Sequence, residues 1–344
     1  MKKNSKNRKH RKSSLADSAR KSLLGLNRIG TSKAEARAEY NAKLREAARA
    51  AGVPEEEIAK LPFAASPYIH SYSTMSQYIS ISENFARWLE IHHPEVTKIQ
   101  YAHKRHYDTE YIQMLIDAGK VPSTIARATS ALAKLYRCSA DDIHSGRPER
   151  RYEDFTRSRG YSEAQFEKDC RKYGDLPSLL RAIGIREVEL EHLYPECFKT
   201  DADGNLFLHL DGHQQHTKGG KTRDVVILEC NQVMVREILS HYTPGELICP
   251  KAPSHLDIHG IRSMYAMDYY SAIARPITPE LAAERIPLKH PKIDNSRPGQ
   301  VRTDAPGTYT RRSDGKVFDR AAMLVVSRSL GHNRVDVMAH SYLR

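Results

Sequence analysis

The chain has 344 residues, 40% of them hydrophobic, which is enough for two domains with a sizeable core, and its formal net charge of +12 favours a polyanionic partner such as nucleic acid. No run of about 18 apolar residues is present and the basic N-terminus lacks the apolar segment of a signal peptide, so we expect a cytoplasmic protein with no membrane partner. The five cysteines form no CxxC pair and are odd in number, which argues for reduced thiols and against a disulfide framework or a zinc site.

The first 69 residues are predicted to lie outside a compact core. Residues 1–31 open with seven Lys or Arg within positions 1–12 and no acidic residue there, so they are predicted to form a disordered basic arm that either contacts phosphates or stays solvated. Residues 32–69 are predicted to hold a surface helix and a connector. Ser32 is the expected N-cap of that helix and Gly52 its expected stop.

The next part, residues 70–140, is predicted to be an all-helical domain. Large apolar residues from Tyr78 to Leu89 recur at helical spacing, and a later helix opens with Pro122. We interpret the apolar stripe as core rather than as a platform for stacking bases. Residues 141–160 are polar and are predicted to link this domain to the next.

Residues 161–344 combine helical and strand patterns. Alternation over 206–210 and an apolar run over 225–228 predict an antiparallel pair with a tight turn at 218–221. Helices are predicted near 175–183, 231–240, 258–274, 319–329 and 334–343. The predicted fold class is therefore α+β and mostly helical, with an all-helical domain followed by a mixed domain that contains a small antiparallel sheet.

Several residues of this second half suit the cleavage of a phosphodiester. This reaction needs a nucleophile, cations that neutralise the non-bridging phosphate oxygens, and an acid that protonates the leaving oxygen. Arg186 and Arg262 are the candidate cations, since a guanidinium donates to phosphate through two N–H groups and stays charged. His259 precedes Arg262 by three positions and would share its helix face. His332 follows Gly331 just before a predicted helix, where an anion is favoured.

The candidate nucleophile is Tyr342. A phosphotyrosine stores the energy of the broken bond, so a strand can rejoin without ATP. Lys218 lies in the predicted turn, from which its ammonium could protonate the leaving 5′ oxygen, and Lys221 is a close rival in the same turn. Taken singly, each of these residues has an ordinary structural explanation, such as a surface arginine or a tyrosine that packs a terminal helix.

Taken together, these motifs resemble the tyrosine recombinases, also called phage-type integrases. GIREVELEHL resembles the first arginine box of that family, with Arg186 as its arginine and Glu189 as the supporting acid. TKGGKTRDVVI resembles the hairpin that bears the catalytic lysine, aligned on Lys218. HGIR is similar to the HxxR box, and SLGHNRVDVMAHSYL to the segment from LGH to the tyrosine. The resemblance covers about 175–344, and the helical region 70–140 resembles the core-binding domain of the family in type and position.

The resemblance implies a tyrosine recombinase-like fold that clamps duplex DNA, and it implies roles for the residues. Tyr342 would form a 3′-phosphotyrosine, Lys218 would be the general acid, and His259 a general base or phosphate ligand. Stabilisation of the transition state would fall to Arg186, Arg262 and His332. No metal, cofactor or nucleotide would be consumed.

The biological task implied is site-specific recombination, as by the integrase of a mobile element. Four protomers would assemble on two DNA sites and exchange strands through a Holliday junction, with DNA-bending or directionality factors as further partners. Two alternatives remain: DNA relaxation like that of a type IB topoisomerase, and a DNA-binding protein that keeps the scaffold without catalysis.

Two departures from the family pattern affect these expectations. Arg262 and His332 are 70 positions apart, which is longer than usual. The excess, about 276–316, is predicted to be a loop-rich insertion that is either solvated or in contact with DNA. Two residues follow Tyr342, so either the chain is truncated or protomers are expected to couple through the short terminal helix or through the insertion rather than by exchange of a longer C-terminal helix.

Overall fold

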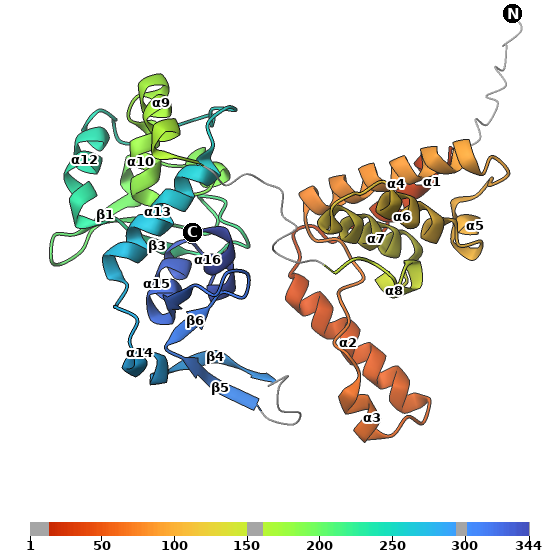
Figure 1. The fold of residues 1–344 in the computed structure, drawn as a ribbon. Coiled ribbons are helices and arrows are strands. Elements are labelled where there is room, and N and C mark those ends of the chain that lie inside the picture. The colour runs from red at the N-terminus through yellow and green to blue at the C-terminus, as the bar shows by residue number, and fades with distance from the viewer. Residues whose placement is uncertain (1–13, 150–160, 294–300, 344) are drawn as a thin grey trace, which may run out of the picture. The chain divides into compact units, whose positions relative to one another are not determined.

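A computed structural model describes residues 14–149, 161–293 and 301–343 of the chain. The protein divides into two compact units, Met1–Phe155 and Thr156–Arg344 (Figure 1). The boundary falls inside the predicted linker, residues 141–160, of which 150–160 lie outside the described residues. None of the helices in the described ranges has the length and apolarity needed to cross a bilayer.

Unit 1 is all-helical in its described residues. Its core forms where α4 (Tyr72–His92) packs against α1 (Leu15–Leu24), α6 (Tyr107–Asp117) and α7 (Pro122–Tyr136). Phe85 and Leu89 of α4 are fully buried there, which confirms that the stripe ending at Leu89 is core. The helices of this bundle are α4 (Tyr72–His92), α5 (Ile99–Lys104), α6 (Tyr107–Asp117), α7 (Pro122–Tyr136) and α8 (Ala140–Ile143).

The prediction of a disordered basic arm over residues 1–31 is wrong from residue 14 onward, because helix α1 (Leu15–Leu24) forms there. Leu15, Ala19 and Leu23 recur every four residues and are buried on one face of α1, where they join the core of unit 1. Burial of this apolar face stabilises the helix although the segment is rich in basic residues. The run of Lys and Arg at positions 1–12 lies outside the described residues.

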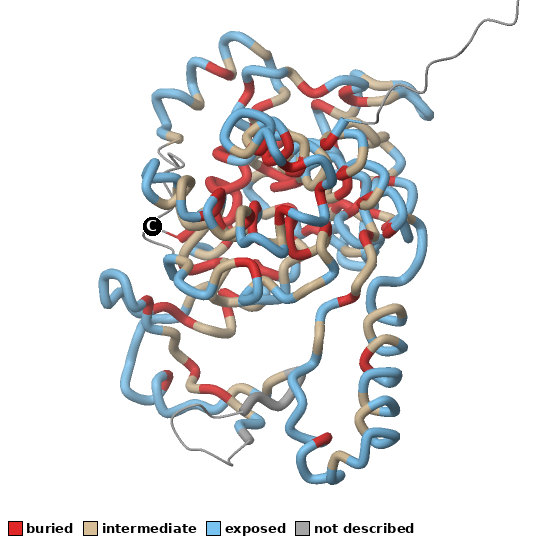
Figure 2. Tube along the Cα trace, turned by 90° about the vertical axis from the view of Figure 1, so that its right-hand side faces the viewer, coloured by how far each residue is buried: buried red, intermediate tan, exposed pale blue. Residues whose placement is uncertain are grey.

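The predicted surface helix is present as α2 (Lys33–Ala50), followed by the short α3 (Glu55–Lys60). Ser32 caps α2 as expected, because its hydroxyl accepts a hydrogen bond from the amide of Glu35 at 3.2 Å. Most of α2 is exposed (Figure 2). Its buried residue, Asn41, bonds both the amide and the carbonyl of Ala64, so a polar side chain anchors the connector to this helix.

Unit 2 joins helices to small antiparallel sheets, which confirms the α+β, mostly helical class. One sheet has the order β1-β2-β3, formed by β1 (Phe198–Thr200), β2 (Leu206–Leu210) and β3 (Arg223–Val226). Leu208 lies opposite both Phe198 and Val225 in the ladders, and these residues are buried in the core of the unit.

The link between β2 and β3 differs from the predicted tight turn. It is a long loop, residues 211–222, and β3 begins two positions earlier than predicted. The buried Thr217 closes the loop: its amide donates to the Gly212 carbonyl at 3.2 Å and its hydroxyl to the Lys221 carbonyl at 2.8 Å. The turn at 218–220 is therefore a small part of a closed loop rather than the tip of a hairpin.

The predicted helices of unit 2 are present, and α9 (Glu163–Tyr173) and α11 (Glu187–Leu190) are added to them. The core of the unit surrounds α13, which packs against α10 and α15. The bounds are α9 (Glu163–Tyr173), α10 (Leu176–Ile183), α11 (Glu187–Leu190), α12 (Glu229–Ser240), α13 (Ile258–Ile273), α15 (Arg320–Ser329) and α16 (Val335–Ser341), with a 3-10 turn at Pro195–Cys197.

The insertion predicted to be loop-rich instead contains a short helix and β-hairpins in its described residues. After α14 (Pro279–Ala283), β4 (Arg285–Ile293) pairs with β5 (Val301–Pro306) in a ribbon that extends from the body of unit 2 (Figure 1). A second hairpin, β6 (Thr308–Thr310) with β7 (Val317–Asp319), leads into α15. The first hairpin was not predicted because two prolines within β4 argue against a strand in the sequence. The strand forms nevertheless, since proline is tolerated on the open edge of a two-stranded ribbon.

Candidate active site

Tyr342 directly follows the short helix α16 and points its hydroxyl into unit 2. Tyr342 is only 3% exposed, and its amide donates to the carbonyl of the buried Met338 of α16 at 3.1 Å. The hydroxyl oxygen accepts a hydrogen bond from Nε of Arg262 at 3.2 Å and lies 3.0 Å from Nε2 of His332. The predicted nucleophile thus contacts two of the residues predicted to act with it.

Arg262 comes from the first half of α13 and is 2% exposed. Its two Nη atoms donate to the carbonyls of Gly184 and Leu330, the latter at 2.5 Å. Gly184 reaches this position with a φ of +54°, and a Cβ there would come within 2.2 Å of the Tyr265 ring. The glycine of the GIR motif therefore places a carbonyl against Arg262 that a larger residue would displace.

His259 lies one turn before Arg262 on α13, as predicted, and its ring is exposed. The centre of that ring is 5.7 Å from the centre of the Tyr342 ring, and the ring of His332 lies 5.6 Å away. Two imidazole rings thus lie close to the phenol ring. In the described structure the hydroxyl itself contacts His332.

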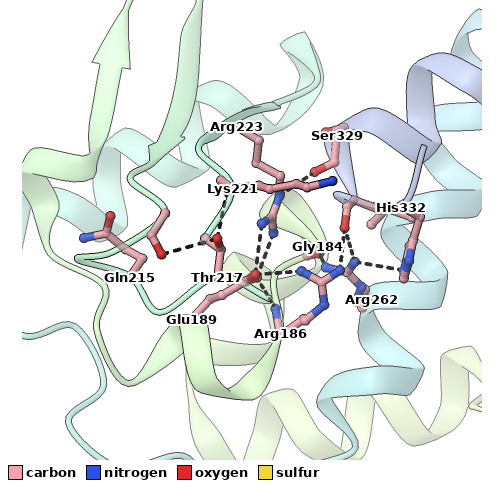
Figure 3. A network of polar contacts seen from close by, with 12 residues as sticks. Gly184, Arg186, Glu189, Gln215, Thr217, Lys221, Arg223, Arg262, Ser329 and His332 are labelled. Atoms are coloured by element: carbon pink, nitrogen blue, oxygen red, sulfur yellow. Dashed lines mark hydrogen bonds and ion pairs between the residues drawn. The ribbon is translucent and has the colours of Figure 1, made fainter. Parts of the chain in front are cut away.

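Glu189 is a fully buried carboxylate that orients two arginines (Figure 3). It accepts from Nη1 of Arg186 at 2.7 Å and forms a two-point pair with Arg223, at 2.9 and 2.7 Å. It also caps α11 by accepting from the Arg186 amide at 2.8 Å. Arg186 then donates its Nη2 to the Leu330 carbonyl at 3.0 Å, the same oxygen that Arg262 contacts.

The ionisation of Glu189 follows from this setting. Burial opposes its charge, but the hydrogen bond and charge of Arg223, together with the charge of Arg186, outweigh burial and lower the pKa of Glu189 to about 2. Its carboxylate is therefore charged at neutral pH. By contrast, none of the ion pairs among residues 14–149, 161–293 and 301–343 involves Arg262. The buried guanidinium of Arg262 therefore has acceptors but no direct ion-pair partner among the described residues, which favours binding of an anion.

His332 is held neutral by its surroundings. Burial is the main cause, and the charges of Arg262, Arg186, Lys218 and Arg223 add to it, so that the pKa of His332 falls to about 3. A neutral imidazole keeps a lone pair on one ring nitrogen, so Nε2 can accept the proton of the Tyr342 hydroxyl while Arg262 donates to the phenol oxygen.

Beside this group lies an open pocket of about 230 Å³ whose lining contains no acidic residue. It is lined by Arg186, Lys218, Lys221, Thr222, Arg223, Arg328, Gly331 and Asn333. Both lysines of the long loop reach it and both are exposed, so its geometry leaves the choice between Lys218 and Lys221 open. A pocket with five cationic side chains is suited to a phosphate group.

Sequence reasoning found most of this group but missed Arg223 and Arg328. Arg223 had a usable signal, since it begins the strand just after the lysine loop and could have been paired with the acid of the first arginine box. Arg328 is one of many basic residues, and its neighbours do not set it apart. The fold therefore adds both residues to the pocket.

No protein-family model matches the chain, and no curated protein matches it in sequence. Within the described ranges, no group of three or more His, Cys, Asp or Glu side chains is arranged to hold a metal ion. The description of the site therefore depends on its geometry and on its chemistry.

Proposed function

We propose that this protein is a site-specific DNA recombinase, the integrase of a mobile element, which cleaves and rejoins DNA strands through a 3′-phosphotyrosine. One observation carries the proposal. The Tyr342 hydroxyl lies within hydrogen-bonding distance of a buried arginine and a neutral histidine, and a basic pocket adjoins them. A phenol, a base and cations around one space are what attack on a phosphodiester requires.

The first step is binding of the scissile phosphate. Arg186 and Arg262 both donate to the Leu330 carbonyl, so their guanidinium groups converge on one point. A phosphate oxygen beside that carbonyl would receive charge-assisted hydrogen bonds from the remaining N–H groups of both arginines. Because Arg262 is buried and makes no direct ion pair among the described residues, the gain is largest as negative charge builds up on the phosphate in the transition state.

The second step is attack by Tyr342. Its hydroxyl proton passes to Nε2 of His332, and the phenolate oxygen bonds to phosphorus while the bond from phosphorus to the 5′ oxygen breaks. Binding of the phosphate partly cancels the positive charges that lower the pKa of His332, so the imidazole becomes a stronger base when DNA is present. His259, whose ring centre lies 5.7 Å from that of Tyr342, is a further candidate to contact the phosphate.

The third step gives the leaving 5′ oxygen a proton, from Lys218 in our assignment and with Lys221 as the rival. Reversal of the same steps with a different 5′ hydroxyl joins a new strand, and the free energy of the phosphotyrosine bond replaces ATP. The substrate is duplex DNA. We further propose four protomers on two sites and, as partners, DNA-bending or directionality factors.

The test is to trap the covalent complex on DNA that carries the ends of the element and a nick near the cleavage site. Loss of the short 5′ fragment prevents rejoining, so the adduct accumulates. We expect Tyr342→Phe to abolish the adduct, because it removes the nucleophilic oxygen alone, and to change DNA affinity by less than about twofold. The matched control is Tyr72→Phe, which alters an exposed tyrosine of unit 1.

An adduct that persists in Tyr342→Phe would contradict the assignment and direct attention to Tyr265, Tyr269 and Tyr270 of α13. Strand exchange between two specific sites separates the proposal from its enzymatic rival, since relaxation of any supercoiled plasmid would favour a type IB topoisomerase-like activity. DNA binding without an adduct on any substrate would favour a non-catalytic DNA-binding protein.

A further inference from the structure

The short helix that carries Tyr342 is fastened at both ends. At its start, the buried Ser327 of α15 accepts from the Arg334 amide at 2.8 Å and donates to the Arg334 carbonyl at 3.0 Å. A helix as short as Val335–Ser341 is not stable alone, so such tertiary contacts determine where it lies. The C-terminal end of the helix is held by a residue of the 276–316 insertion.

At the far end, Arg311 reaches the helix from the turn of the β6–β7 hairpin. Its Nη1 donates to the carbonyl of Ala339 at 2.6 Å and to the carbonyl of Leu343 at 2.5 Å. These acceptors lie on either side of Tyr342 in the sequence. The last carbonyls of a helix have no partner within it and form the negative end of its dipole, so a guanidinium is well suited to this place.

Arg311 is itself held rigidly. It is 8% exposed, its Nε donates to Oδ1 of Asp314 at 2.8 Å, and its guanidinium lies over the Phe318 ring at 5.3 Å. Within the hairpin turn, its amide donates to the Lys316 carbonyl at 2.8 Å. Because these contacts fix the Arg311 side chain, the position of the hairpin determines the position of the helix end.

We propose that Arg311 is a positioning residue that holds the Tyr342 helix in the active site of its own chain, and that the β6–β7 hairpin exists to present it. The inference rests on the proposed function for its consequence in catalysis. The insertion then determines where the nucleophile lies. Arg311 fixes the end of the helix, so the Tyr342 hydroxyl stays within hydrogen-bonding distance of Arg262 and His332.

The experiment compares Arg311→Met, Arg311→Lys and the wild type in the full chain. Single-turnover adduct formation is measured on the nicked DNA over a range of DNA concentrations. With Arg311→Met we expect the rate constant at saturating DNA to fall at least tenfold, about 1.4 kcal/mol in activation free energy, while the half-saturating concentration stays unchanged. Arg311→Lys keeps one charged donor and should recover part of the rate. Arg312→Met, at the exposed neighbouring position, is the matched control and should behave as the wild type.

Amide hydrogen exchange gives a second readout that does not depend on catalysis. In Arg311→Met, protection should fall over 335–343 and be retained in α13 and α15. Unchanged rate and exchange would overturn the proposal, and so would exchange that rises evenly throughout unit 2, since that would assign Arg311 a general structural role. A wild type that forms no adduct would refute the proposed function, and the exchange data would still decide whether Arg311 holds the helix.

Discussion

At the scale of single residues, the protonation of His332 reports on the charge around the site. The pKa of this residue falls to about 3 because it is buried among Arg262, Arg186, Lys218 and Arg223. In the unfolded chain its pKa returns to about 6.5. Between these values the unfolded state binds a proton that the folded state excludes, so the stability contributed by neutral His332 is present above about pH 6.5 and declines as the pH falls.

This predicts a pH-dependent difference between the wild type and His332→Gln, which has a polar side chain that does not titrate. As the pH falls from about 6.5 to about 4, the wild type should lose more unfolding free energy than the variant, because only the wild type contains this protonation difference. Urea unfolding at each pH measures it. Parallel pH profiles would show that His332 is protonated as readily in the folded as in the unfolded chain.

At the scale of elements, the long loop 211–222 carries both lysines that are candidates for the proposed general acid. Both lysines line the pocket, but the charge of Lys218 is among those that lower the pKa of His332, which places its ammonium in the electrostatic field of the reacting group. Thr217 and Gly212 close the loop beside it, since a Cβ at Gly212 would approach the Gly220 carbonyl oxygen to 2.1 Å. The loop is thus a fixed support rather than a flexible hairpin tip.

We therefore predict that Lys218→Ala slows adduct formation by about 10²–10⁴-fold, the usual contribution of a general acid. Replacing the leaving 5′ oxygen with sulfur should restore most of this rate, because a thiolate leaves without a proton. Lys221→Ala, the matched control in the same loop, should lose less rate and gain no such rescue. Rescue of Lys221→Ala alone would reverse the assignment.

The elements also show where sequence reasoning succeeds. Helices α10 and α15 have clear apolar spacing, and they were predicted within a few residues. The β4–β5 ribbon was missed because prolines and charges mask its alternation, and α1 because seven basic residues precede it. Strand pairing and burial depend on distant partners, which a local pattern does not contain.

The same limit applies to the site. The motifs predict Arg186, Arg262, His332 and Tyr342 as one group, and hydrogen bonds connect them in the structure. Arg311 could not be predicted, because its role depends on two carbonyls 28 and 32 positions away that only the fold brings to it. Side chains that position others leave no motif of their own.

At the scale of the whole molecule, the net charge of +12 predicts that DNA binding depends strongly on salt. Each protein–phosphate pairing releases condensed counterions, so the logarithm of the binding constant falls with the logarithm of salt concentration by about 0.9 per phosphate neutralised. The seven basic residues at positions 1–12 are the densest positive run of the chain, with no acid among them. They are the part of the molecule whose contribution to this slope is easiest to isolate.

We predict that replacing these seven residues with Gln, which preserves the length of the segment, makes the salt slope shallower by about 0.9 for each phosphate that the variant no longer neutralises. Replacing seven exposed Lys or Arg of unit 1 is the matched control for net charge. If only the net charge determines binding, the Gln variant and the unit 1 variant will have the same salt slope. If positions 1–12 bind phosphates, only the Gln variant will have a shallower salt slope than the wild type. Equal slopes for the wild type and the Gln variant would identify positions 1–12 as a solvated tail. Adduct formation at saturating DNA should be unchanged in the Gln variant, because the reacting group lies entirely within residues 184–342 of unit 2.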